Sequence, residues 1–373
     1  MTDVVALTEA LVSEDSVSGN SNASVSAVAR QAMEEAGFEV EQLDRHDEHG
    51  ELKVSLVGKK GGAAEPSEGL GLYSHSDTVP GDSWEDRAWS PRHEGDHLIG
   101  LGSCDMKGPL AATIAAGSRC DAADLRRPLI VAVTADEEIS GLGARTVANE
   151  SDLHAKHRPR LGVIAEPTGL VPVYAHKAGG RVFVSARGRA AHTSTGKGIS
   201  SNYLIAPFLA DAAVLVKQLE ADPSYHNLEF DPPHNCINLV LNDFGTRPNV
   251  TPPLTVATFS FRPMPGDRSH DVAAALCDLA DRHGLESEFN VGDPFYVAPD
   301  SDVVKLALQA TGVERAETVA FGTDSGAFKE QVELVVLGPG NIQQAHTVDE
   351  FISIAQLQQA VDVYEKMTRE ICG

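Results

Sequence analysis

Three consecutive acids, Asp136-Glu137-Glu138, follow directly on an apolar run at residues 129–135. The run is short, rich in β-branched residues and free of charge, which is typical of a strand buried on both faces. Such a strand would carry three carboxylates at its carboxyl end, where repulsion and partial loss of solvent are costly without a compensating cation or hydrogen bonds. A metal site with an adjacent catalytic base would explain the triplet. An acidic solvated loop is the alternative.

Other predicted strands of the chain also end in residues that can bind a metal ion. These residues are His75 and Asp77 after residues 70–74, Glu166 after residues 161–165, and His346 after the strand at 334–337 and a Gly-Pro-Gly turn. In open α/β sheets, functional sites lie outside the carboxyl ends of the strands. We therefore expect these side chains to converge in space with the acidic triplet.

A further carboxylate, Asp105, lies in a glycine-rich stretch at residues 100–108, just before a predicted helix. Taken singly, each candidate has a structural interpretation: Asp105 could cap that helix, and Glu166, which precedes a proline, could be a turn residue. A lone histidine such as His75 is more often structural than a metal ligand, and His346 alone could be a surface residue. Together, two imidazoles and several carboxylates fit a site suited to zinc or cobalt, and they exceed the needs of one tetrahedral ion, so two ions sharing a carboxylate are expected.

The elements that would position these residues alternate between helix and strand. The predicted elements are a helical segment from Val4 to Gly37, strands at 54–57 and 70–73, a loop at 58–64, a helix at about 108–120, and strands at 129–135 and 161–165. This alternation predicts an α/β sheet with helices on both faces.

The pattern changes near Lys177. The next predicted elements are a half-exposed strand at 181–186, a helix at about 201–220, strands at 237–241 and 254–261, and a helix at about 271–283. They indicate a small α+β domain with one sheet face bare or packed on another copy. The buried pattern then returns with a helix at 302–311, a strand at 334–337 and a helix at about 354–371. We therefore expect a first domain at residues 1–176 and 293–373, interrupted by an inserted domain at residues 177–292.

The composition narrows the classes of partner. The 373 residues include 54 acids and 30 bases, for a net charge of −24, which disfavours nucleic acid and anionic membranes as partners. The five cysteines form no Cys-x-x-Cys pair, which fits reduced thiols. With no apolar run of transmembrane length and no basic N-terminal signal, the sequence predicts a soluble cytoplasmic protein. An excess of acidic residues also favours solubility at high salt, where screening weakens their mutual repulsion. A halophilic source is therefore a hypothesis.

Several motifs resemble one family of enzymes. The stretches are His75-Ser-Asp77-Thr-Val-Pro, Gly100-Leu-Gly-Ser-Cys-Asp105-Met-Lys-Gly, Thr134-Ala-Asp-Glu137-Glu138, Ala165-Glu166-Pro-Thr and Gln344-Ala-His346. They resemble, in order and over residues 70–352, the co-catalytic zinc amidohydrolases, which include acetylornithine deacetylase, succinyl-diaminopimelate desuccinylase, aminoacylase and glutamate carboxypeptidase. Within this family, the stretches around Asp105, Tyr174, Arg262 and His346 are most similar to those of acetylornithine deacetylases.

The resemblance implies a fold and a set of metal ligands. The fold is a mixed-sheet α/β catalytic domain with an inserted ferredoxin-like α+β domain for lid and dimer contacts. Asp105 would bridge two zinc ions, with a cis peptide bond after it. The other implied ligands are His75 and Glu166 on one ion and Glu138 and His346 on the other. Glu137 would be the general base and Asp77 would orient His75.

The resemblance also implies roles for residues outside the metal centre. Residues 188–194 resemble the family's lid segment, whose histidine, His192 here, reaches across a homodimer and stabilises the oxyanion. Asn249 and Arg262 resemble substrate-binding positions, and Arg262 could hold an α-carboxylate with its two-pronged guanidinium. Thr323 lies in a stretch that resembles a pocket loop. Without the resemblance, His192 and Arg262 could be ordinary surface residues.

The predicted reaction is hydrolysis of the amide of a small N-acyl amino acid. N²-Acetylornithine, cleaved to ornithine and acetate in arginine biosynthesis, is the expected substrate, and two divalent ions are the expected cofactors: zinc, with cobalt and manganese as alternatives. A desuccinylase of the lysine pathway, a general N-acyl-amino-acid deacylase and a dipeptidase remain open. A non-catalytic metal-binding subunit of the same fold is the alternative from another class.

Overall fold

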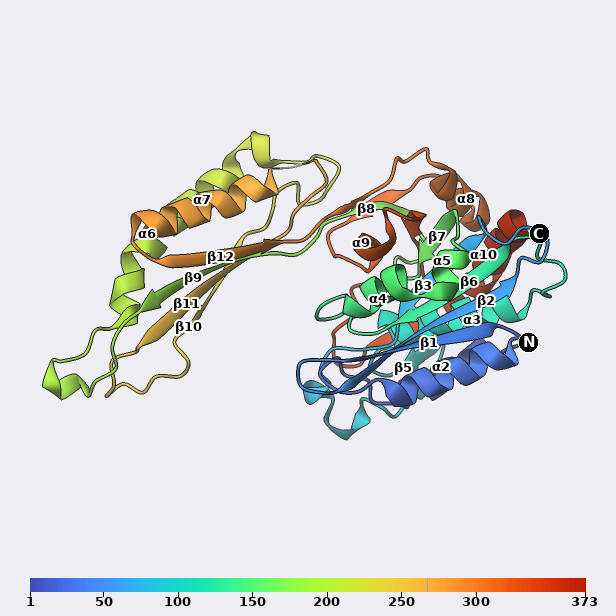
Figure 1. Cartoon of the computed structure of the whole chain (residues 1–373), viewed down its shortest axis with the longest axis horizontal. Helices are drawn as coiled ribbons and strands as arrows, with labels where there is room; N and C mark the ends of the chain where they lie inside the picture. Colours follow the sequence, from blue (N-terminus) through green and yellow to red (C-terminus); the bar gives the residue numbers. More distant parts are fainter. Residues whose placement is uncertain (267) are drawn as a thin grey trace. The chain divides into compact units, whose positions relative to one another are not determined.

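The chain divides into two compact units (Figure 1). The computed structural model describes residues 1–266 and 268–373, apart from the side chains of Glu85 and Asp86. Unit 1 comprises residues 1–174, 297–317 and 323–373, and unit 2 comprises residues 175–296 and 318–322. The insertion expected at residues 177–292 lies inside unit 2.

Unit 1 is built on a large mixed sheet. Its strands that lie wholly within unit 1 are β1 Glu39–His46, β2 Leu52–Gly61, β3 Leu70–His75, β6 Pro128–Thr134, β7 Leu161–Ile164 and β15 Glu333–Val336. Three short strands complete the nine among the described residues and belong wholly or partly to unit 2: β8 Val173–His176, β13 Phe295–Tyr296 and β14 Glu317–Val319. A smaller sheet contains β4 Arg92–Glu94, β5 His97–Ile99 and β16 Phe351–Ser353. The helices are α1 Val4–Val12, α2 Ala23–Glu35, α3 Gly108–Ser118, α4 Leu142–Glu150, α5 Asp152–Lys156, α8 Asp302–Thr311, α9 Ser325–Phe328 and α10 Ile354–Cys372.

The strand order of the large sheet brings four parallel strands together. The order is β1-β2-β6-β3-β7-β15-β8-β13, with β14 paired to β8. Strand β3 is parallel to both β6 and β7, and β15 is parallel to β7. Because parallel strands end at the same edge of a sheet, the segments that follow β6, β3, β7 and β15 meet there.

Helices cover both faces of this sheet, as predicted. Apolar side chains of α1, α2, α3, α8 and α10 share one core with Val131 and Val133 of β6. Side chains alternate along a strand, so Ile130 and Ala132 face the opposite side, where α4 packs on β2 and β6. Every residue of β6 is buried, which explains its unbroken apolar sequence.

The N-terminal region differs from its prediction as a single helical segment. It forms two helices, α1 and α2, with an irregular stretch at residues 13–22 between them. This stretch is rich in Ser, Asn and Gly, and its buried side chains bond to other parts of unit 1: the Ser16 hydroxyl donates to the Ser76 carbonyl at 2.7 Å, and the Asn22 amide donates to the Val54 carbonyl at 2.8 Å. Such bonds compete with helical ones. The end predicted at Gly37 is confirmed, because this glycine has a φ of +83° just after α2.

The loop predicted at residues 58–64 was also wrong in part, because strand β2 continues through Gly61. Lys60 is buried there, and its ammonium group donates to the carbonyl oxygens of Ala36 at 2.6 Å and Gly117 at 3.1 Å.

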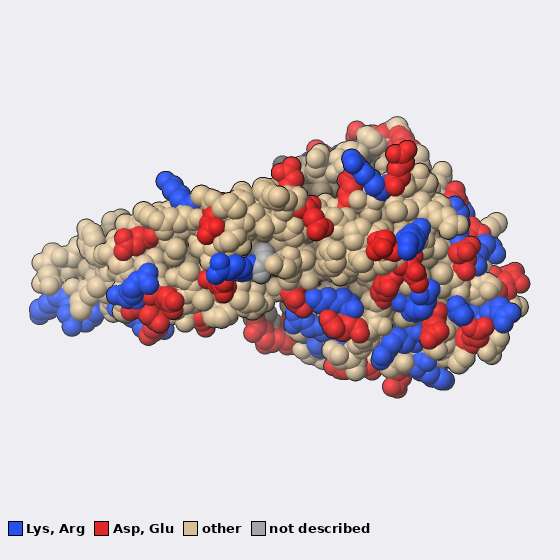
Figure 2. All heavy atoms as spheres, turned by 90° about the horizontal axis from the view of Figure 1, so that it is seen from above, with Lys and Arg blue, Asp and Glu red and all other residues tan. Residues whose placement is uncertain are grey.

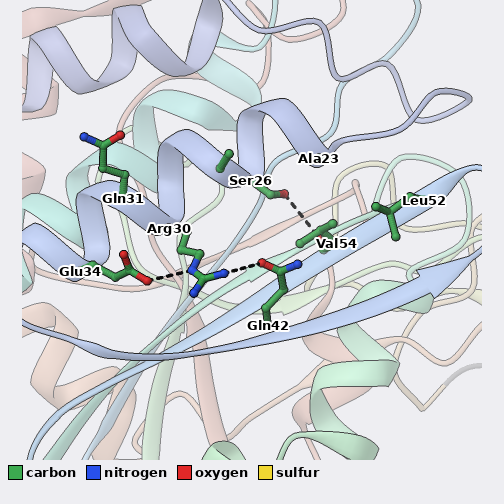
Figure 3. A pocket seen from close by; sticks show the side chains of 9 residues that line it. Ala23, Ser26, Arg30, Gln31, Glu34, Gln42, Leu52 and Val54 are labelled. Atoms are coloured by element: carbon green, nitrogen blue, oxygen red, sulfur yellow. Dashed lines mark hydrogen bonds and ion pairs between the residues drawn. The ribbon is translucent and has the colours of Figure 1, made fainter.

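Strand β1 was not predicted, since it carries charged residues along most of its length. It pairs antiparallel with β2. A groove of about 280 Å³ separates this ribbon from α2, with the Arg30 guanidinium 3.1 Å from Gln42 across it (Figure 3).

Unit 2 is an antiparallel sheet with two helices. Its elements are β9 Gly180–Arg187, α6 Ser201–Ala221, β10 Asn238–Asn242, β11 Leu254–Phe261, α7 Ser269–Arg282 and β12 Glu286–Val291. The β-α-β-β-α-β sequence with sheet order β10-β11-β9-β12 is the ferredoxin-like topology. Its core contains Val182, Phe208, Phe259 and Leu276. The predicted fold class is therefore confirmed, with β12 as the strand that the prediction lacked.

No helix within the described residues combines the length and apolar character needed to cross a bilayer. On the face shown in Figure 2, acidic and basic side chains are interspersed and do not gather into one basic patch.

Candidate metal centre

Five of the predicted residues lie together at the carboxyl edge of the parallel strands. They form two groups whose potential ligand atoms lie within 4.8 Å of one another, namely His75, Asp105 and Glu166, and Asp105, Glu138 and His346. His75 ends β3, Glu138 follows β6, Glu166 follows β7 and His346 follows β15. Asp105 comes from residues 103–107, which lead into α3. Convergence at this edge thus follows from the strand order.

Asp105 belongs to both groups. One of its oxygens, Oδ1, lies 3.2 Å from Nε2 of His75, and the other, Oδ2, lies 3.4 Å from Nε2 of His346. Each histidine faces a second carboxylate as well: His75 is 3.6 Å from Glu166, and His346 is 3.1 Å from Glu138. A carboxylate with one oxygen toward each group has the arrangement needed to bridge two ions.

The position of Asp105 is fixed by Glu350, a residue that the sequence analysis missed. The carboxylate of Glu350 accepts the backbone N–H groups of Cys104 at 2.8 Å and of Asp105 at 2.9 Å. Burial raises the pKa of Glu350 to about 8. The peptide bond between Asp105 and Met106 is cis, as the resemblance predicted. Asp105 is not a helix cap, since Lys107 precedes α3 and makes no side-chain cap bond.

Glu166 is held by a close approach between two strand ends. Gly338 follows β15, and a Cβ atom there would lie 2.1 Å from the carbonyl oxygen of Ala165. The Gly338 carbonyl also accepts the N–H of Thr168 at 3.2 Å. Glycine is therefore required in the Gly-Pro-Gly turn, and the turn fixes the segment that carries Glu166.

Asp77 contacts His75 mainly through its backbone. Nδ1 of His75 lies 3.0 Å from the Asp77 carbonyl oxygen and 3.6 Å from the carboxylate. The carboxylate instead accepts the Ser18 hydroxyl at 2.7 Å and the backbone N–H groups of Glu137 and Glu138, both at 3.2 Å. Asp77 thus holds two of the three acids that follow β6, Glu137 and Glu138, and the sequence offered no signal for Ser18.

Charge in the cluster favours a bound cation. Burial opposes ionisation of Asp105, but hydrogen bonds from His346 and His75 outweigh it and hold its pKa well below the usual range. The hydrogen bonds to Asp105 and Glu138 raise the pKa of His346 to about 10. Burial, with Asp105 next in effect, raises the pKa of Glu166 well above its usual range. These imidazole and carboxylate donors suit zinc, cobalt or manganese, and a divalent ion would displace the protons that the histidines hold.

Glu137 and Asp324 form a second pair of acids in unit 1. Burial raises the pKa of Glu137 well above its usual range, and the charges of Asp324, Glu138 and Asp105 act in the same direction, against the opposing charge of His75. Asp324 accepts the hydroxyl of Thr134 at 2.7 Å, and burial raises its pKa to about 6. Asp324 follows Thr323 in the stretch that resembles a pocket loop, but it was not among the predicted site residues. Its neighbour Thr323 is half-buried and accepts the Ser325 N–H at 3.1 Å.

The remaining predicted residues, His192, Asn249 and Arg262, lie in unit 2 and are exposed. Residues 192 and 250 form an isolated bridge, and the Asn249 carbonyl accepts the N–H of Thr193 at 3.0 Å. Nδ1 of His192 lies 2.7 Å from the Ser194 hydroxyl, which leaves Nε2 to face outward. Arg262 follows β11, where its backbone N–H donates to Asn235 at 2.7 Å. These three residues therefore share a unit with one another but not with the five-residue cluster.

Comparison with known proteins gives consistent matches over the whole chain. Acetylornithine deacetylase of Myxococcus xanthus is 31% identical over 381 residues, covering 98% of this chain and 97% of that protein. Acetylornithine deacetylase of Proteus mirabilis is 28% identical over 376 residues, covering 98% of this chain and 94% of that protein.

Solved structures share the fold at lower identity. A family M20 metallo-carboxypeptidase from Sulfolobus solfataricus has a TM-score of 0.75 and 16% identity, with 99% of each chain covered. A Bacillus subtilis protein described as a dinuclear metal binding peptidase from family M20 has a TM-score of 0.65 and 14% identity, covering 99% of this chain and 97% of its own. The profile of Peptidase family M20/M25/M40 matches residues 71–370. The chain therefore belongs to this family of hydrolases, as the sequence motifs predicted.

Proposed function

We propose that the protein is a dinuclear metal-dependent amidohydrolase that cleaves the amide bond of a small N-acyl amino acid. The observation that carries this proposal is the pair of donor groups sharing Asp105, with Glu137 beside them. In each group one imidazole and two carboxylates provide three protein donors, which leaves room for water or substrate. The complete donor set and the base argue against a non-catalytic subunit.

The roles of the residues follow from their chemistry. Two bound divalent ions would acidify a water molecule and polarise the substrate carbonyl. Glu137 accepts a proton from the attacking water as the C–O bond forms and the carbonyl becomes a tetrahedral oxyanion, and it returns the proton to the nitrogen as the C–N bond breaks. The proposed ligands are His75, Asp105, Glu138, Glu166 and His346. Asp77 holds His75 through its carbonyl group and the two glutamates through its carboxylate.

The proposed substrate is N²-acetylornithine, with ornithine and acetate as products. Support comes from the similarity to proteins named acetylornithine deacetylase over nearly the full chain. We assign Arg262 to the substrate α-carboxylate, and Asn249 and Thr323 to further substrate contacts. Some solved structures of similar fold are described as peptidases, including a di-peptidase. Dipeptides are therefore a second class of substrate to test.

We propose that unit 2 is a lid and dimerisation domain, from which the His192 Nε2 group of the partner subunit binds the substrate carbonyl oxygen. The supporting observation is apolar exposure: Tyr203 and Val214 of α6 are 84% and 56% exposed, and Val240 and Leu241 of β10 are 56% and 52% exposed. Strand β10 is also an edge of its sheet. An exposed apolar edge strand is a surface that a second copy can cover.

We also propose a cytoplasmic location, which the free cysteines fit.

The direct test combines metal binding with a substrate panel. Metal-free protein is titrated with zinc, cobalt or manganese, and hydrolysis of N²-acetylornithine, N-succinyl-diaminopimelate and dipeptides is measured in low and molar KCl. We expect two ions per chain and a preference for N²-acetylornithine. Glu138→Gln and His346→Ala should each reduce the bound metal toward one ion per chain. Unchanged stoichiometry in both variants would contradict the ligand assignment.

A further inference from the structure

Asp136, the first acid of the triplet, is buried and paired with two cations. Its side chain is 3% exposed. It forms an ion pair with Arg45 of β1, and its Oδ1 lies 3.1 Å from the ammonium group of Lys53 on β2. A carboxylate without such partners would be costly to bury. Asp136 is therefore part of a buried ion-pair network and has a structural role of its own next to the two glutamates.

The backbone at Asp136 makes the turn that follows β6. Its φ is +61°, and its carbonyl oxygen accepts the N–H groups of Ser140 at 3.0 Å and Gly141 at 2.8 Å. A non-glycine residue with positive φ persists only where its surroundings hold it. The two cations provide that support, so the side chain of Asp136 fixes the direction in which Glu137 and Glu138 leave the strand.

Lys53 connects this ion pair to Asp77. The Lys53 side chain is 2% exposed, and its ammonium group donates to the carbonyl oxygens of Ser18 and Asn20, the latter at 2.7 Å. The hydroxyl of the same Ser18 donates to Asp77 at 2.7 Å. Asp77 in turn accepts the N–H groups of the two glutamates. A continuous chain of bonds therefore holds the acidic segment at its start, through Asp136, and at its end, through Asp77.

Three contributors to this chain of bonds, Ser18, Arg45 and Lys53, precede residue 71, where the match to the family profile begins. We propose that they form, with Asp77 and Asp136, a clamp that positions Glu137 for proton transfer. They are positioning residues, because each acts through Asp136 or Asp77 and not on the substrate. The proposal deepens the proposed function and rests on it. A base held by two sets of bonds needs little reorganisation, and small displacements of such groups cost much of the rate.

The first test follows the clamp in the absence of metal and substrate. Backbone amide exchange at Glu137 and Glu138 is measured in chelator-treated protein for Lys53→Met, Asp136→Asn and Ser18→Ala. We expect exchange at least about tenfold faster in the first two variants and a smaller increase in Ser18→Ala, which removes one hydroxyl and keeps the ion pairs. The matched control is Lys59→Met on the same strand, whose partner Glu39 is exposed. Wild-type exchange in all three clamp variants would overturn the proposal.

The second test uses the metal-loaded enzyme. Lys53→Met and Asp136→Asn should lower kcat at least about tenfold, with KM within about twofold and wild-type metal content. The double variant should lose no more than the more damaged single variant, because both substitutions break one unit. Lys53→Arg, which keeps the charge, should restore most of kcat. Unchanged kcat with only a lower melting temperature would overturn the positioning role.

The two tests separate failure of the clamp from failure of the proposed function. A wild-type enzyme that hydrolyses no N-acyl amino acid in the panel would refute the proposed function. Amide exchange would still decide whether the clamp holds the acidic segment. If Lys53→Met does not fold, Ser18→Ala decides the question, and wild-type exchange in this variant overturns the proposal.

Discussion

The five-residue cluster of unit 1 and the candidate residues of unit 2 are organised in opposite ways. In unit 1, four of the five predicted ligands are buried or held by neighbouring segments, such as Asp105 by Glu350 and the segment before Glu166 by Gly338, whereas His346 is 49% exposed and contacts Asp105 and Glu138. In unit 2, His192 is exposed, and its ring bonds only to the nearby Ser194 among the contacts that the structure describes.

This difference teaches how the work of one enzyme can be divided. A metal centre requires several donors at fixed distances, and a buried sheet edge provides them. Substrate recognition requires groups that can engage and release a ligand, which suits exposed side chains on a separate unit. We therefore expect substitutions in unit 1 to act on chemistry and metal binding, and those in unit 2 to act on transition-state contacts and substrate affinity.

The largest effect is expected for Glu137→Gln. Glutamine keeps the size of the side chain but cannot accept the proton, so kcat should fall about 10³-fold. Metal content, measured by atomic emission, should remain that of the wild type. Near-normal turnover would remove Glu137 from the role of base, and loss of metal would make it a ligand.

A smaller loss is expected for His192→Ala. Removing one hydrogen-bond donor to a developing oxyanion should lower kcat about 10²-fold, without a change in metal content. His270→Ala, at an exposed position on α7, is the matched control. Mixed dimers of Glu137→Gln and His192→Ala subunits should recover one working site, whereas no recovery would exclude a histidine supplied by the partner subunit.

Arg262→Lys should change substrate affinity more than turnover. Lysine keeps the charge but loses the two-pronged contact with a carboxylate, so KM should rise about tenfold with kcat nearly unchanged. Arg181→Lys, at an exposed position on β9, is the control. An unchanged KM would remove Arg262 from the substrate-binding residues.

The smallest effect concerns the stability of unit 1 at low pH. His154 is buried beside the hydroxyl of Tyr73, at 2.9 Å, and burial lowers its pKa to about 4. The unfolded chain binds a proton near pH 6.5, so stability should fall as the pH drops from about 6.5 toward 4. Between pH 7 and pH 5, the free energy of unfolding, measured with denaturant, should fall by about 1–2 kcal/mol more in the wild type than in His154→Gln. His283→Gln, in unit 2, should resemble the wild type.

The parallel core of the fold was predictable because its strands are buried on both faces and their sequences are correspondingly apolar. Strand 129–135 and helix 302–311 were placed to within about a residue. Strands β1 and β12 were not, since both carry charged residues and are partly exposed. The break between α1 and α2 depends on distant partners of Ser16 and Asn22, which no local pattern encodes.

For the candidate site, strand ends and motifs brought the five cluster residues together. The residues that hold them were not predictable in the same way. Ser18, Lys53 and Glu350 come from separate segments, and in the folded unit they bond to Asp77, Asp136 and the backbone of Asp105, respectively. Serine, lysine and glutamate are common on protein surfaces. Only the folded structure shows that these three side chains are buried and bonded near the site.

The hold of Glu350 on Asp105 also bears on when the site can form during synthesis. Asp105 belongs to both donor groups, yet its backbone is fixed by the side chain of Glu350, which lies 245 residues later in the chain and near His346 in sequence. A ribosome adds about 5–20 residues per second and releases the N-terminal part first. A nascent chain therefore exposes His75, Asp105 and Glu166 before it can complete either group in its final geometry. Both donor groups therefore reach their final geometry only after residues 346–350 have been made and can fold onto Asp105.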